Sequence, residues 1–130
     1  SEGAAIAVFE TEEGARARGA RALARVAFWT SWREPENAPL ADAPPPPEGA
    51  CVLVGRVDAA LGQKLRGTAW ADVPVRSLAP RAGDHEGAGG FAVAAAVAAL
   101  ARGSLPAALV FGSALGRGYA LLLVTPGARE

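Results

Sequence analysis

Hydrophobic residues along the chain gather in short runs that polar, glycine-rich or proline-rich segments separate. Runs of about four to eight apolar residues rich in Val, Leu, Phe and Trp are typical of β-strands, and continuous runs are typical of strands buried on both faces. The pattern therefore predicts strands over residues 4–9, 22–32, 51–57, 68–75, 107–111 and 119–125, the fourth of them interrupted by Pro74.

Polar residues before two of the intervening segments predict short helices. Thr11 followed by Glu12 and Glu13 provides an N-cap and an acidic first turn, and arginines among alanines continue to residue 21. Residues 13–21 are therefore expected to form a short solvated helix or turn. Asp58 is expected to cap a second short helix that ends at Leu65.

A longer helix is predicted over residues 88–102, after a loop at 76–87, because an apolar segment there ends at Gly103. Its Ala, Val, Leu and Phe residues lie on all sides of the helix, which predicts burial on most sides. A domain of 130 residues offers little to cover such a helix. We therefore expect the cover to come from a second, similar half-domain.

The segment 33–49 has a different composition, with Pro35, Pro39 and the run 44–47 excluding helix and interior strand. It predicts an exposed linker with the stiffness of polyproline. A role as a ligand for an aromatic groove is the alternative, and the stiff loop is the preferred interpretation.

Alternating strands and helices that end in a glycine-rich hairpin at 112–118 predict an α/β fold with a mixed sheet covered by helices. The length fits one domain over residues 1–130, with the proline-rich loop inside it. Thirteen basic and thirteen acidic residues balance, so the charge favours neither nucleic acid nor anionic lipid as a partner. No apolar run approaches the ~20 residues of a membrane span, and no signal peptide is visible. Together with the single Cys, this predicts a cytoplasmic protein.

The order of motifs resembles the C-terminal half of the β-ketoacyl synthases. Residues 2–10 and 15–20 are similar to the Gly-Glu-Gly-Ala strand and the Ala-Arg-Gly-Ala turn that open this half. Residues 84–90, the Ala-rich segment after them and 103–106 resemble the family's Gly-His loop, buried helix and leucine-proline exit. Residues 111–124 lie where the family has its glycine-rich turn between the last two strands. The resemblance implies a thiolase-like half-fold, with acyl carrier protein and acyl chains as the chemical context.

The catalytic positions of the family are mostly absent. Its Cys nucleophile belongs to the N-terminal half, which this chain does not contain, and the loop that would carry its first His reads Gly-Arg-Val-Asp at 55–58. Pro80 and Arg81 stand near the position of its Lys. Only His85, the chain's single His, matches a catalytic residue, where it would donate a hydrogen bond to a thioester carbonyl. A vestigial or structural role for His85 is the preferred interpretation.

Other residue types give weaker signals. Cys51 begins a predicted buried strand and is expected to be a small buried hydrophobe. The spacing of Gly112, Gly116 and Gly118 fits a tight hairpin rather than a phosphate-binding loop. Trp29, Trp32 and Trp70 are expected to be core or interface anchors. One His and one Cys do not supply a metal cage, and no cofactor is expected.

These observations predict a non-catalytic ketosynthase-like subunit or fragment, comparable to a chain-length factor. Its partner would be a ketosynthase, an N-terminal half-domain or a second copy of itself, in fatty-acid, polyketide or aryl-polyene assembly. Two alternatives remain: one part of an active condensing enzyme whose Cys lies on another chain, and a stand-alone interaction module on the same fold.

Overall fold

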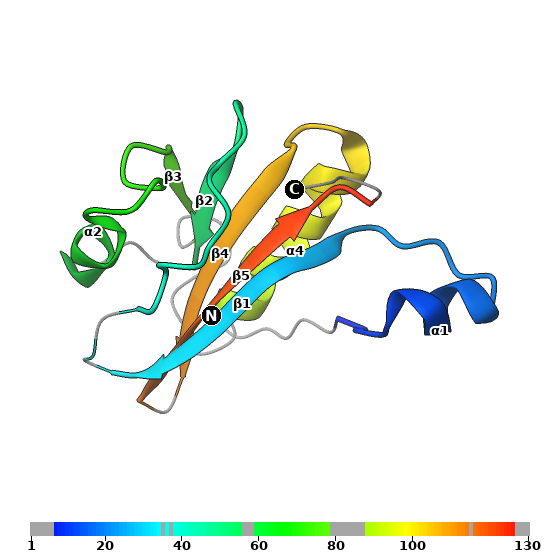
Figure 1. Cartoon of the computed structure of the whole chain (residues 1–130), viewed down its shortest axis with the longest axis horizontal. Coiled ribbons are helices and arrows are strands. Elements are labelled where there is room, and N and C mark those ends of the chain that lie inside the picture. Colours follow the sequence, from blue (N-terminus) through cyan, green and yellow to red (C-terminus); the bar gives the residue numbers. More distant parts are fainter. Residues whose placement is uncertain are drawn as a thin grey trace.

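A computed structural model of the chain describes residues 7–34, 36, 38–55, 59–78, 88–114 and 116–126. It contains a five-stranded sheet with helices on both faces and one helix, α1, that projects from the end of the sheet (Figure 1). The elements, in chain order, are α1 (Glu12–Ala17), β1 (Arg25–Arg33), β2 (Cys51–Val54), α2 (Ala59–Leu65), β3 (Val75–Ser77), α4 (Ala88–Arg102), β4 (Ala107–Ala114) and β5 (Arg117–Val124).

The sheet is mixed, as predicted, with strand order β1-β5-β4-β2-β3. β2 pairs in parallel with β3 and with β4, whereas β5 pairs antiparallel with β4 and with β1. β1 and β3 are therefore the two edges of the sheet. The C-terminal hairpin is also confirmed, and its strands are longer than predicted, since pairing continues to Ala114 opposite Arg117.

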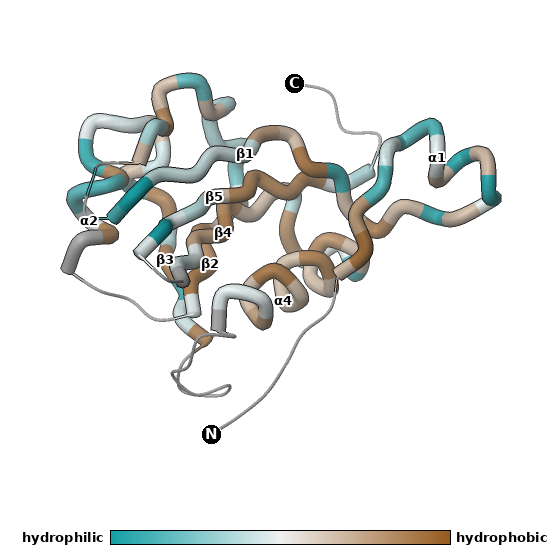
Figure 2. Tube along the Cα trace, turned by 90° about the horizontal axis from the view of Figure 1, so that it is seen from below, coloured by the Kyte–Doolittle hydropathy of each residue, from teal (hydrophilic) through white to brown (hydrophobic). Residues whose placement is uncertain are grey.

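Each face of the sheet has its own hydrophobic core. α4 covers one face, where Cys51, Leu53 and Val110 point. α2, the proline-rich loop and the turn around Trp70 cover the other, where Val52, Leu109 and Leu122 point. The hydrophobic colouring in Figure 2 is concentrated on the central strands and on α4. These layers explain why β2 is buried along its whole length.

Two predicted strands are wrong. Residues 7–9, the described part of the strand expected at 4–9, lie outside the sheet, with Val8 80% and Phe9 61% exposed. Residues 68–74 form turns that begin where the Thr68 hydroxyl donates to the Leu65 carbonyl. The edge strand β3 follows Pro74, because proline lacks the amide that a ladder needs and extended backbone resumes only after it.

The short helices are confirmed. Thr11 caps α1, its hydroxyl accepting a hydrogen bond from the Gly14 amide at 2.9 Å. α2 ends at Leu65 as predicted, while its expected cap, Asp58, lies outside the described residues.

The proline-rich loop is less exposed than a linker would be. Leu40 is buried, and the Trp70 indole N–H donates to the Pro44 carbonyl at 2.9 Å. The loop is therefore part of the cover of one sheet face, although Pro45 and Pro47 remain exposed.

α4 has the predicted boundaries, and Gly103 ends it with a φ of +77°. Its sheet-facing side is buried through Ala92, Ala96, Ala99 and their neighbours. The outer side is exposed, contrary to the prediction of burial on most sides. The sheet covers only one side of the helix, and on the other the described residues leave alanines in contact with solvent. No helix in the described part of the chain is long and apolar enough to span a membrane.

Candidate functional site

The carboxyl ends of β2, β3 and β4 meet at one edge of the sheet, the place where open α/β sheets most often bind ligands. The Ser77 hydroxyl, at the end of β3, donates to the Gly55 carbonyl after β2 at 3.0 Å. This bond joins the segments that leave the two strands. In the described part of this edge, the segments after β2 and β3 are therefore joined by a hydrogen bond between a hydroxyl and a backbone carbonyl.

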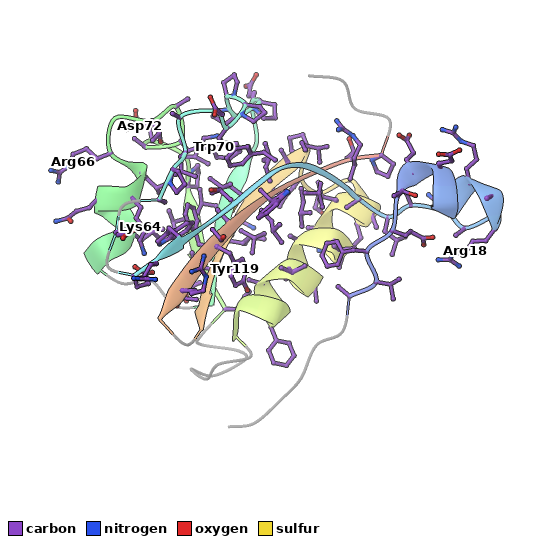
Figure 3. The ribbon with its side chains drawn as sticks, turned by 60° about the horizontal axis from the view of Figure 1, so that its bottom comes forward. Arg18, Lys64, Arg66, Trp70, Asp72 and Tyr119 are labelled. Carbon is purple, nitrogen blue, oxygen red and sulfur yellow. The ribbon has the colours of Figure 1, made fainter. Side chains whose placement is uncertain are left out.

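The Tyr119 side chain on β5 lies at the same end of the sheet, beside the start of α4 (Figure 3). Its ring lies directly over Gly112 of β4, and its hydroxyl lies against Gly89 of α4. A Cβ at Gly112 would be 2.2 Å from the Tyr119 Cζ, and a Cβ at Gly89 would be 2.3 Å from the hydroxyl oxygen. Burial raises the pKa of the Tyr119 phenol, so the group is a neutral donor at physiological pH.

The glycines of the hairpin therefore have different tasks. Gly116, with a φ of +78°, makes the turn, whereas Gly112 and Gly118 lie within strands. Gly118 leaves room for Trp32, whose ring atoms would be 2.4–2.5 Å from a Cβ there. The hairpin interpretation is confirmed, and the spacing of the glycines reflects the packing of Tyr119 and Trp32.

The sequence-predicted site residues are not brought together by the described structure. His85 lies outside the described residues, as do 56–58 and 79–81, where the family motifs place its first His and its Lys. Cys51 is described, and it is a buried core residue as expected, at the start of β2 rather than at its carboxyl end.

The environment of Cys51 disfavours its thiolate. Burial raises the pKa of the thiol, and nearby Arg76 lowers it by a smaller amount. The Sγ lies 3.4 Å from the Val52 carbonyl oxygen, to which it donates. Since only the thiolate is strongly nucleophilic, this cysteine is poorly suited to covalent catalysis.

A second polar cluster, which the sequence did not reveal, lies on the α2 face at the end of β1. The Lys64 ammonium is 2.9 Å from a Glu34 carboxylate oxygen and 5.4 Å from the centre of the Trp32 ring. The ring centroids of Trp32 and Phe111 are 6.2 Å apart in an edge-to-face contact. The buried indole N–H of Trp32 has no hydrogen-bond partner among the described residues. Thirty residues separate Lys64 from Glu34, so no periodic pattern could have paired them.

The three tryptophans differ in burial. Trp32 and Trp70 belong to the core, as expected, whereas Trp29 on β1 is 68% exposed.

No group of three His, Cys, Asp or Glu side chains that could hold a metal gathers among the described residues.

Comparison with known proteins gives no relative: the chain matches no known protein family, no curated protein and no solved structure.

Proposed function

We propose that the chain is a non-catalytic β-ketoacyl-synthase-like subunit or fragment. It completes a thiolase-type fold with a ketosynthase, or with an N-terminal half, and it helps to bound a pocket for a growing acyl chain in fatty-acid, polyketide or aryl-polyene assembly. The order of the sequence motifs supports this proposal. A mixed sheet with an apolar helix and a C-terminal hairpin is consistent with it.

The exposed side of α4 is the observation that carries the proposal. This 15-residue helix contains a single charged residue, Arg102, and buries one side against β4, β2 and β5. On its other side Ala94, Ala98 and Ala101 are exposed. Small side chains allow a second helix to approach closely, and a solvated surface helix normally carries polar residues there. A matching half-domain packed on this side would complete the burial that the sequence of α4 favours.

The surroundings of Cys51 support a non-catalytic role. Decarboxylative condensation needs a thiolate nucleophile beside groups that stabilise charge on a thioester carbonyl. The only cysteine is buried with a raised pKa, at the opposite end of β2 from the loop that matches the family's first His. Catalysis in the assembled protein is therefore the task of the partner, and the resemblance implies acyl carrier protein as the source of its substrates.

Association with a ketosynthase tests the proposal. The purified chain is mixed with each β-ketoacyl synthase of its own organism, and the mass of the product is measured by light scattering after size exclusion. We expect a complex that Ala98→Glu abolishes. Ala17→Glu, the same change at an exposed position of α1, leaves it intact. The proposed contact through the exposed side of α4 is refuted if the chain associates with none of these synthases. It is also refuted if Ala98→Glu leaves a complex unchanged.

A condensation assay distinguishes the non-catalytic proposal from the alternative of a divided active enzyme. It measures turnover of acyl and malonyl thioesters of acyl carrier protein. We expect no turnover by the chain alone and equal turnover by complexes that contain wild type or His85→Ala. A large loss with His85→Ala would assign His85 to the chemistry and favour a divided active enzyme.

A further inference from the structure

Strand β1 forms one edge of the sheet (Figure 1), and β5 is the only strand that pairs with it among the described residues. Edge strands of soluble proteins normally carry Pro, Lys, a bulge or an inward charge that prevents further pairing. β1 has a bulge between Val26 and Phe28. The residues after the bulge, 28–32, are regularly paired with β5 and include no proline and no charged residue. We call residues 28–32 the edge stretch, and its outer side is a template for another strand.

The backbone of the edge stretch directs hydrogen-bonding groups away from the sheet. The Glu34 amide donates to the Gly116 carbonyl at 2.8 Å, so residue 34 faces β5. In an antiparallel pair, residues that face the partner strand alternate with residues that face away from it. The even-numbered residues of the edge stretch therefore face β5, whereas Trp29 and Ser31 direct their amides and carbonyls outward. A strand added to this edge would meet the backbone groups of these two residues.

The edge stretch also exposes a large apolar side chain. Trp29 is 68% exposed, and it pairs with Leu121, so it lies on the α4 face of the sheet. α4 packs mainly against β4, β2 and β5, and it leaves the Trp29 side chain in solvent. A strand added outside β1 would bury part of this ring, which is favourable in proportion to the apolar area that is covered.

A second copy of the edge stretch matches these outward groups in one antiparallel register. A two-fold axis at Thr30 sets Thr30 opposite Thr30, and it sets Trp29 of each copy opposite Ser31 of the other. The outward amides and carbonyls of Trp29 and Ser31 then bond reciprocally across the two strands. An axis at Trp29 would instead set Ser31 opposite the bulge. An axis at Ser31 would need the Arg33 carbonyl, which already accepts from the Glu36 amide at 2.8 Å.

The side chains that meet in this register are compatible. Thr–Thr pairs and aromatic contacts across a strand pair are stabilising, and the two Trp29 residues become diagonal neighbours, about 7–8 Å apart and within reach of each other. The arginines at the two ends of β1 stay apart. Arg33 lies on the α4 face with Trp29, whereas the bulge places Arg25 on the α2 face, where its pairing partner Val124 packs. A second copy is therefore the partner that the described edge fits.

We propose that two copies of the chain pair antiparallel through their edge stretches, which joins their sheets into one. The two Trp29 side chains contribute roughly 200–350 Å² of buried area, since each is about two-thirds exposed and a fully buried ring covers about 150–250 Å². With so short a stretch of paired backbone, the interface stays below the ~1,200 Å² of a standard complex, so the dimer is weak and its population depends on concentration. The edge of β1 and the outer side of α4 are different surfaces, and this inference does not rest on the proposed function.

Sedimentation equilibrium of the purified chain is the first test. A dimer has twice the 13.1 kDa of the chain, 26.2 kDa. We expect the mean mass to rise toward 26.2 kDa as the concentration increases to about 1 mM. Trp29→Lys should keep the chain monomeric with unchanged circular dichroism, because the side chain is exposed and an edge lysine opposes pairing.

Two control variants locate the interface. Val75→Lys makes the same kind of change at an exposed apolar residue of the other edge strand, β3, and Ala98→Glu changes the outer side of α4. Both should dimerise like wild type. A wild type that stays monomeric over the whole range, a dimer that survives Trp29→Lys, or a dimer that Ala98→Glu dissociates overturns the proposal.

Disulfide trapping tests the register. In a Cys51→Ala background, Thr30→Cys sets two thiols opposite each other at the two-fold axis, in a non-hydrogen-bonded pair whose Cβ atoms are close enough for a disulfide. We expect oxidation to give a linked dimer. Arg33→Cys, at an exposed position of the same strand, lies opposite the bulge of the other copy and should stay unlinked. The absence of a linked dimer with Thr30→Cys, or linkage of Arg33→Cys at the same rate, refutes the pairing.

Discussion

Replacing Gly112 by alanine tests the packing at the carboxyl edge of the sheet. The new methyl group would be 2.2 Å from Cζ and from the hydroxyl oxygen of Tyr119, and 2.7 Å from Cε2. These distances are far below van der Waals contact, so the ring must move. The start of α4 confines it, because the Tyr119 hydroxyl already lies against Gly89.

The expected cost follows from overpacking, which typically destabilises a core by about 1–3 kcal/mol. Alanine recovers some backbone entropy relative to glycine, about 0.5–1 kcal/mol in an unhindered element. We therefore expect Gly112→Ala to lower the free energy of unfolding by roughly 1–2 kcal/mol. For a domain of this length the melting temperature should fall by about 4–8 °C.

Gly62 provides a matched control. It lies in α2, with no atom within 4 Å of the position of its Cβ. Gly62→Ala should therefore raise the free energy of unfolding by about 0.5–1 kcal/mol, the opposite sign for the same chemical change. Urea unfolding followed by tryptophan fluorescence measures both. In a Tyr119→Ala background the cost of Gly112→Ala should disappear. A Gly112→Ala protein as stable as wild type, or one whose loss persists without Tyr119, refutes the account of the site.

Three further predictions concern Trp70, Tyr119 and Cys51. Trp70→Phe removes the hydrogen bond to the Pro44 carbonyl and should cost about 1 kcal/mol in urea unfolding, with faster hydrogen exchange in the proline-rich loop; unchanged exchange there would contradict it. Burial raises the pKa values of Tyr119 and Cys51, so the folded protein holds these protons more tightly and stability should fall as the pH rises through about 8.5 to 10. Tyr119→Phe should flatten the upper part of that fall, and an unaltered profile counts against a buried phenol. Cys51 should react with a thiol reagent at neutral pH only as fast as the protein opens, and labelling at the rate of a free thiol would show that it is accessible.

Much of the architecture follows from local patterns. The boundaries of α4 are predictable because its apolar composition and Gly103 define one helix, and because α4 covers the central strands it determines one of the two cores. The mixed sheet follows from alternating elements and a terminal hairpin. Thr11 is predictable as a cap because its hydroxyl acts within one turn. In each case the deciding interaction is local in the sequence.

The remaining features depend on contacts between distant residues. The apolar run at 7–9 has the composition of a buried strand, yet Val8 and Phe9 are exposed and the helix that follows, α1, buries no residue. In the sequence, Gly112 and Gly118 resemble turn residues. Glycine is needed at these positions because the rings of Tyr119 and Trp32, on neighbouring strands, leave no room for a Cβ. Lys64 and Glu34 meet only after α2 has packed against the end of β1. A single sequence offers no signal for such pairs.

The pairing of β1 with β5 has a consequence for synthesis. Arg33 pairs with Arg117 and Arg25 with Val124, so β1 lacks the strand it pairs with in the described structure until residues 117–124 have been made. At a translation rate of about 5–20 residues per second, a strand that contains two tryptophans and a phenylalanine leaves the ribosome roughly 4–20 s before β5 is made. During that interval it is the natural target for chaperones and for aggregation, and the rate of elongation between these strands becomes a determinant of yield.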